Sequence, residues 1–92
     1  IQKISSKIGM MKNLERVYLI NNELTKIPST IGNLKKLKVL DLSGNQLERL
    51  PSSIRQLKDH LEVLRLYGNN FTEDQIKRFK KWLPSTEISF NP

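Results

Sequence analysis

The sequence contains no cysteine, a single histidine and no long apolar run, and each absence narrows what the chain can be. Without cysteine it forms no disulfide, no thiolate zinc site and no thiol nucleophile, which leaves its redox compartment open. His60 has no second histidine or cysteine to share a metal or a reaction with, so we expect a solvated loop residue. No segment is apolar enough to span a membrane, and no signal peptide is visible, although a missing start would have removed one.

Motifs for catalysis are also missing. The sequence holds no G-x-x-x-x-G-K-[ST], no H-E-x-x-H and no G-x-S-x-G. Asp41 and Glu87 are carboxylates that are predicted to face the same way, but no nearby base or nucleophile completes a site. We therefore expect no enzyme activity, no metal and no cofactor.

Repetition is what the sequence has in abundance. The pattern L-x-x-[LV]-x-L-x-x-N-x-[LF] occurs three times, starting at Leu14, Leu37 and Leu61, so the spacings are 23 and 24 residues. A second pattern, [IL]-P-x-x-I-x-x-L, follows from Ile27 and from Leu50. This period and these leucine and asparagine positions are the signature of a leucine-rich repeat, in which each copy forms one coil of a solenoid.

The whole chain follows this frame, which predicts one domain over residues 1–92. Its parts are a partial repeat (1–13), three repeats (14–36, 37–60 and 61–71) and a C-terminal cap helix with a degenerate last strand (72–92). Leu83, Thr86, Ile88 and Asn91 are assigned to the frame of that fourth copy. The predicted fold is an α/β leucine-rich repeat solenoid, a right-handed horseshoe segment with a short parallel sheet on the concave face.

Local patterns predict the limbs of each coil. Alternating apolar and polar residues, as in 62–67, predict a short strand with one buried face. Asn22, Asn45 and Asn69 follow the strands, where an inward amide satisfies backbone groups of the turn, so we assign them a structural role. The proline-led segments Ser29–Leu34 and Ser52–Leu57 predict short helical or 3₁₀ turns on the convex side.

The two ends of the chain differ. Thr72 and Gln75 form a capping box, and the apolar residues Ile76, Phe79 and Leu83 share one face, so residues 72–83 predict a longer amphipathic helix that closes the C-terminal end. The start has no cap, because Ile1 begins halfway round a coil. We expect a truncated protein with an unpaired strand edge at its N-terminal side, through which the chain could self-associate.

Strand positions between the leucines are predicted to point to the concave face in three columns. The columns are Arg16, Val39, Val63 and Ser85; Tyr18, Asp41, Arg65 and Glu87; and Ile20, Ser43, Tyr67 and Ser89. Tyrosine and arginine among smaller apolar groups are typical of a protein-binding hot spot. The alternative is that these are ordinary strand-forming residues. Partner-binding residues are thus predicted at Arg16, Tyr18, Ile20, Val39, Asp41, Ser43, Val63, Arg65, Tyr67 and Glu87.

The charge is unbalanced, with a formal net charge of +7. Such a charge favours acidic partners. Most basic residues are spread along the outer limb and the loops, which is typical of a solvated face, and only 77–81 is dense. The second hypothesis is therefore polyanion binding (glycosaminoglycan, nucleic acid or anionic membrane) by Lys77, Arg78, Lys80 and Lys81, with nucleic acid the less favoured ligand.

These residues resemble leucine-rich repeat proteins of the class that carries L-P-x-x-I on the convex limb, over essentially the whole chain. The ending from Asn69 to Asp74, followed by Leu83-Pro84 and Ile88-x-Phe90, is similar to the C-terminal caps of short repeat proteins from pathogenic spirochaetes. The resemblance implies a protein-interaction module that is secreted or surface-exposed and contacts a host protein. A cytoplasmic signalling adaptor stays open, because similar eukaryotic proteins have that role.

Overall fold

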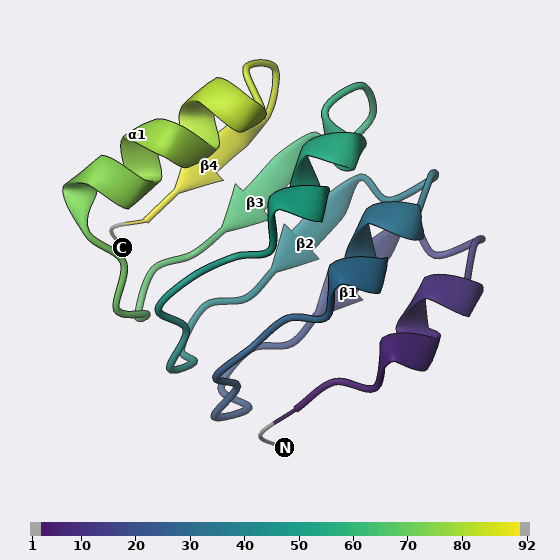
Figure 1. Cartoon of the computed structure of the whole chain (residues 1–92), viewed down its shortest axis with the longest axis horizontal. Helices are drawn as coiled ribbons and strands as arrows, with labels where there is room; N and C mark the ends of the chain where they lie inside the picture. Colours follow the sequence, from purple (N-terminus) through teal and green to yellow (C-terminus); the bar gives the residue numbers. More distant parts are fainter. Residues whose placement is uncertain (1–2, 91–92) are drawn as a thin grey trace.

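The computed structural model describes residues 3–90, which form successive coils of one solenoid (Figure 1). Each coil has a strand on one side and a helical segment on the other. In chain order the elements are η1 (Ser6–Met10), β1 (Arg16–Tyr18), η2 (Ser29–Asn33), β2 (Val39–Asp41), η3 (Ser52–Leu57), β3 (Val63–Arg65), α1 (Glu73–Trp82) and β4 (Glu87–Ser89), where η marks a 3₁₀ helix. The two predicted convex turns are confirmed as η2 and η3.

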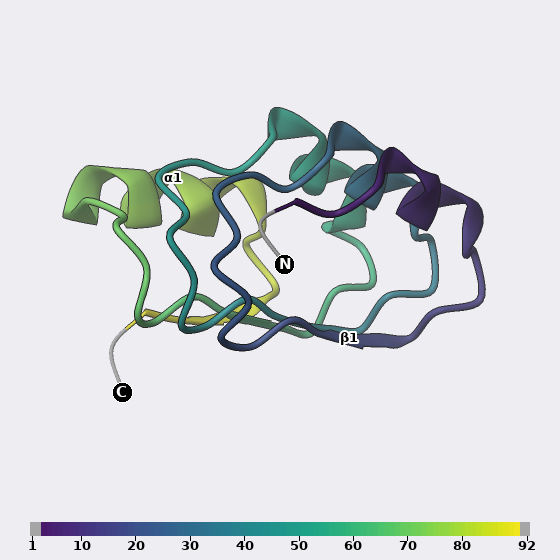
Figure 2. The same ribbon diagram turned by 90° about the horizontal axis from the view of Figure 1, so that it is seen from below.

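The strands form one parallel sheet in the order β1-β2-β3-β4. Figure 2 shows this sheet as one layer and the helices as a second layer above it. Val17, Leu40 and Leu64 pair in register across the first three strands and point inward, because a 23- or 24-residue period brings the same position back on each coil. The leucine-rich repeat fold predicted from the sequence is therefore confirmed.

The core between the two layers is a stack of the repeated aliphatic residues. Its fully buried members come from every apolar position of the pattern except that of Ile27 and Leu50, which are each 6% exposed. They are Leu24, Ile31, Leu34, Leu37, Leu40, Leu42, Leu47, Ile54, Leu57, Leu61, Leu64 and Leu66. Burial of a leucine or isoleucine side chain contributes about 1.5–3 kcal/mol, so this stack is the main source of stability.

The asparagines join one coil to the coil before it. Asn45 Oδ1 accepts the amides of Asn22 and Leu24 at 2.9 and 3.0 Å, and its Nδ2 donates to the carbonyls of Leu19 and Leu42, both at 2.8 Å. One coil later, Asn69 Oδ1 accepts the amide of Leu47, and its Nδ2 donates to the carbonyls of Leu42 and Leu66. These bonds confirm the structural role predicted for Asn45 and Asn69, since they pair backbone groups that the inward turn hides from water.

Hydroxyl groups join the helical segments on the convex side. Thr30 Oγ1 donates to the carbonyl of Ser6 at 2.7 Å, and Ser53 Oγ donates to that of Ser29 at 2.6 Å. A Cβ built on Gly32 would lie 2.5 Å from the carbonyl oxygen of Ser53, so η2 and η3 approach to a distance that only glycine permits. The 3₁₀ helices are thus tightly packed on one another.

The C-terminal helix α1 spans Glu73–Trp82, one residue shorter at each end than the predicted 72–83, and it has the predicted cap. Thr72 is the N-cap residue, and the capping box with Gln75 is formed in both directions. Phe79 is buried and packs edge-on against Phe71, with ring centroids 5.2 Å apart. None of the helices described between residues 3 and 90 has the length and apolar character needed to cross a membrane.

The extra residue of the third repeat widens the turn after η3. The amide of Leu37 bonds to the carbonyl of Leu34, three residues back, whereas the amide of Leu61 bonds to that of Leu57, four residues back. His60 lies in this wider turn, half-buried, with its Nε2 2.9 Å from the carbonyl oxygen of Leu34. The expectation of a solvated histidine is wrong, because the ring ties the turn to the preceding coil; a carbonyl only accepts, so Nε2 donates.

Candidate protein-binding surface

The concave face is formed by strand residues that alternate with the buried ones. Tyr18, Asp41 and Arg65 are aligned across β1, β2 and β3, and Arg16 aligns with Val39 and Val63 in the same way. Backbone bonds continue this register past the strand ends, because the amide of Asn21 bonds to Ser43 and that of Gly44 to Tyr67. The structure thus assembles the first three members of each predicted column.

The fourth member of each column is displaced by two residues. Val63 pairs with Glu87 and Arg65 with Ser89, whereas Glu87 was expected beside Arg65 and Ser89 beside Tyr67. Ser85 lies in the turn before β4 and not in the sheet. The assignment anchored on Leu83 is wrong because Leu83 is buried as the C-cap residue of α1, so the last strand begins later than that frame allows. Asn91, which was assigned to the same frame, lies outside the described residues.

Exposure on this face is uneven. Tyr18 and Ile20 are 54% and 45% exposed, and Arg16, Arg65 and Glu87 are also exposed. Val39, Val63, Tyr67 and Ser89 are half-buried. Asp41 and Ser43, by contrast, are only 2% and 3% exposed, although both were predicted to contact a partner on this face.

Hydrogen bonds explain the burial of Asp41. Its Oδ1 accepts the hydroxyl of Ser43 at 2.7 Å and the amide of Ser43 at 3.1 Å. Its Oδ2 lies 3.5 Å from Arg65 Nη1, and this is the one ion pair among residues 3–90. A buried carboxylate is stable only when its oxygens are bonded, and here Ser43 supplies most of that bonding. Asp41 therefore orients Arg65 from below and is itself shielded from a ligand.

The apolar part of the face lies on the first coil. Four large hydrophobic residues are strongly exposed within residues 3–90, and two of them, Tyr18 and Ile20, lie on this face. The column register places Tyr18 beside Asp41 and two strands from Arg65, with β2 between them. An exposed tyrosine and isoleucine on the same face as an arginine that is paired with Asp41 combine apolar area with a charge, which is the composition of a protein contact.

The basic residues of the C-terminal helix do not form one patch with this face. Lys77, Arg78, Lys80 and Lys81 are exposed on α1, in the helical layer behind the sheet. Lys80 Nζ lies 5.1 Å from the ring centroid of Phe90, a cation–π contact. No group of three or more potential metal ligands occurs within residues 3–90.

The structure has stacked coils, a parallel sheet on the concave face and a column of inward-pointing asparagines, Asn45 and Asn69. These features define a leucine-rich repeat protein, a class that generally serves as a protein-interaction scaffold and typically lacks catalysis. The model of a family described as leucine-rich repeats in two copies matches residues 12–58 and 35–81. The chain belongs to the leucine-rich repeat family.

A solved structure of a leucine-rich repeat protein from Leptospira interrogans is similar to this chain. The two are 43% identical, and the TM-score is 0.94. The match covers 98% of this chain and 23% of the Leptospira chain, so this chain spans about a quarter of that protein. No curated protein matches.

Proposed function

We propose that this chain binds a protein partner through its concave face, with Tyr18, Ile20 and Arg65 as the central contacts. The observation that carries the proposal is the pair of large apolar side chains left exposed on a face that also holds an oriented arginine. Arg16, Val39, Val63, Tyr67 and Glu87 would surround this centre, and Asp41 and Ser43 would support it from beneath. The chain acts as a scaffold without catalysis.

The size of the face limits the affinity. Four strands at about 4.8 Å spacing span roughly 15 Å, and a stable interface buries about 800 Å² on each partner. The described part of the molecule measures 31 × 29 × 20 Å, so the concave face alone barely reaches that area. We expect a dissociation constant on the order of micromolar for this chain by itself.

The likeness to the Leptospira protein supports a bacterial origin. We extend the proposal to a host protein as the partner, on the condition that the chain is exported. A bacterial or cytoplasmic partner would support an adaptor role through the same face.

The test is a comparison of two double variants. Tyr18→Ala with Ile20→Ala removes apolar area from the concave face, and Met10→Ala with Met11→Ala removes it from exposed positions outside the sheet, where the residues are 76% and 55% exposed. Partners captured from host and bacterial extracts are identified by mass spectrometry, and the affinity of each is then measured with the purified proteins.

Loss of binding only in the Tyr18 and Ile20 variant supports the concave face, because the two variants remove similar area. An affinity that neither variant changes would reject this face as the contact surface. Equal thermal unfolding midpoints of the two variants serve as the control for folding.

A further inference from the structure

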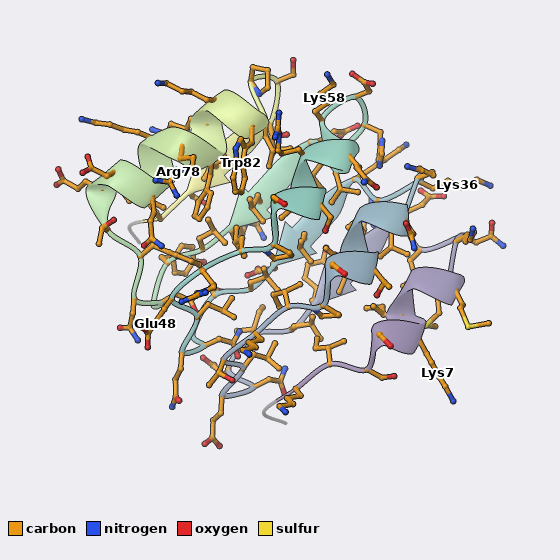
Figure 3. All side chains as sticks on the ribbon, viewed as in Figure 1. Lys7, Lys36, Glu48, Lys58, Arg78 and Trp82 are labelled. Carbon is orange, nitrogen blue, oxygen red and sulfur yellow. The ribbon has the colours of Figure 1, made fainter. Side chains whose placement is uncertain are left out.

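A groove of about 620 Å³ runs between η3 and α1 on the side opposite the concave face. Figure 3 shows Trp82 on the flank of α1 that faces η3, with Lys58 near the end of η3. The residues that line the groove come from both elements and from the turn after α1. They are Ser52, Ser53, Arg55, Gln56, Lys58, Lys81, Trp82 and Pro84.

The groove exists because the tight packing of the convex layer ends at η3. Gly9 and Gly32 allow the following 3₁₀ helix to approach each turn, and the residue one repeat further on is Arg55. Arg55 thus carries a side chain at the position where Gly9 and Gly32 have none, and it lines the groove. In addition, α1 contains no serine or threonine, so the hydroxyl bond that ties Ser53 to η2 has no counterpart from α1. The helix therefore stands away from η3.

The charge of the groove has one sign. Arg55, Lys58 and Lys81 line it, and none of its lining residues is acidic. All three side chains are exposed, and none takes part in an ion pair within residues 3–90. Clustered positive charges without internal partners attract an anion with several charges, because each added pair also releases counterions.

The remaining walls combine an aromatic ring with polar groups. Trp82 is half-buried, with its ring 5.5 Å from that of Phe79, so one side packs on the helix and the other faces the groove. The face of an indole ring is electron-rich and packs well on C–H groups. Exposed Ser52 and Gln56 supply hydroxyl and amide groups that donate and accept hydrogen bonds.

We propose that this groove binds a segment of an anionic polysaccharide, with sulfate or carboxylate groups on Arg55, Lys58 and Lys81 and a sugar ring on Trp82. An acidic sugar offers a matching group for each wall: acidic groups for the basic side chains, hydroxyls for Ser52 and Gln56, and a face of C–H bonds for Trp82. Single-stranded nucleic acid fits less well, because its sites offer several aromatic rings in succession and this groove has one. An acidic peptide fits less well because the open groove has no enclosed pocket to select a side chain. This site is separate from the concave surface and does not depend on it.

Trp82 is the only tryptophan, so its fluorescence reports on this groove alone. The probe is a heparin-derived octasaccharide, titrated at about 150 mM salt, where diffuse charge attraction is largely screened. One triple variant carries Arg55→Gln, Lys58→Gln and Lys81→Gln. The control triple carries Lys7→Gln, Lys12→Gln and Lys36→Gln, which removes the same charge from exposed positions that do not line the groove; Lys7 lies at the far end of the solenoid (Figure 3).

The expected result is a saturable change in Trp82 emission, an affinity about tenfold lower in the groove variant, a smaller dependence on salt, and little change in the control. Equal losses in both variants, or no response of Trp82, would overturn the proposal. So would undiminished binding of a desulfated octasaccharide, or tighter binding of a twelve-residue oligothymidine or of polyglutamate. Because all the replaced side chains are exposed, circular dichroism should show unchanged folding, and calorimetry on the folded variants measures the affinities independently of fluorescence.

Discussion

Replacing Asn22, Asn45 or Asn69 by alanine should lower the free energy of unfolding by a different amount in each case, although the three residues occupy equivalent repeat positions. Asn45 makes five hydrogen bonds: two accepted by Oδ1 and three donated by Nδ2. Asn69 makes three, with the amide of Leu47 and the carbonyls of Leu42 and Leu66. Among residues 3–90, Asn22 makes one, an exposed bond of 3.3 Å from its Nδ2 to the carbonyl oxygen of Ile20.

The magnitudes follow from the backbone groups that lose a partner. In Asn45→Ala the amides of Asn22 and Leu24 and the carbonyl of Leu19 lose their bond to the side chain, whereas the carbonyl of Leu42 keeps Asn69 as a donor. At roughly 1–1.5 kcal/mol for each group, the cost is about 3–5 kcal/mol. Asn69→Ala affects two such groups and should cost about 2–3 kcal/mol. Asn22→Ala should cost less than about 1 kcal/mol.

Urea unfolding followed by circular dichroism measures the series, and Trp82 fluorescence provides a second probe. The free energy of unfolding of a domain is typically about 5–15 kcal/mol, so the loss in Asn45→Ala is large enough to lower the midpoint clearly. If Asn22→Ala costs as much as Asn45→Ala, or if all three variants agree within about 0.5 kcal/mol, hydrogen bonds between coils do not set the role of this column.

Two further predictions concern the convex layer and the edge of the sheet. Gly32→Ala should lower the free energy of unfolding by about 1–3 kcal/mol in the same assay, because the new Cβ would lie 2.5 Å from the carbonyl oxygen of Ser53. Asn33→Ala, at an exposed neighbouring position, is the control and should change it little. Equal unfolding midpoints for the two variants would contradict tight packing of η2 on η3. Among the described residues β1 pairs only with β2, so we expect concentration-dependent self-association through this edge in sedimentation velocity, and a single monomeric species across the micromolar range would exclude it.

The repeat period was sufficient to predict the coils, the core and the role of Asn45 and Asn69. It failed at the last coil, where Leu83 was taken as the start of a fourth copy. Counting 24 residues from Leu64 leads instead to Ile88, the residue that pairs with it. The 24-residue spacing of the third copy therefore predicts the correct register. Leu83, which ends α1, was mistaken for the first leucine of a repeat because it is also apolar.

Alternation along a strand identifies the face of a side chain but not its exposure. Asp41 and Ser43 were correctly assigned to the concave face and yet are buried, because the Ser43 hydroxyl folds onto the carboxylate. That contact depends on side-chain rotamers two residues apart, which no period encodes. His60 is a similar case, since its bond to Leu34 depends on how the widened turn is folded.

The groove between η3 and α1 could not be predicted from the sequence. Along the sequence Arg55, Lys58 and Lys81 are scattered charges, which is typical of a solvated surface. Lys58, the C-cap residue of η3, and Lys81 on α1 nevertheless line the same groove, because η3 and α1 belong to successive coils. What the sequence does not state is the space between them, which depends on α1 standing away from η3. Because the groove and the concave face lie on opposite layers, a ligand in one leaves the other free, so occupancy of the groove should not change the affinity of the Tyr18 and Ile20 surface for its partner.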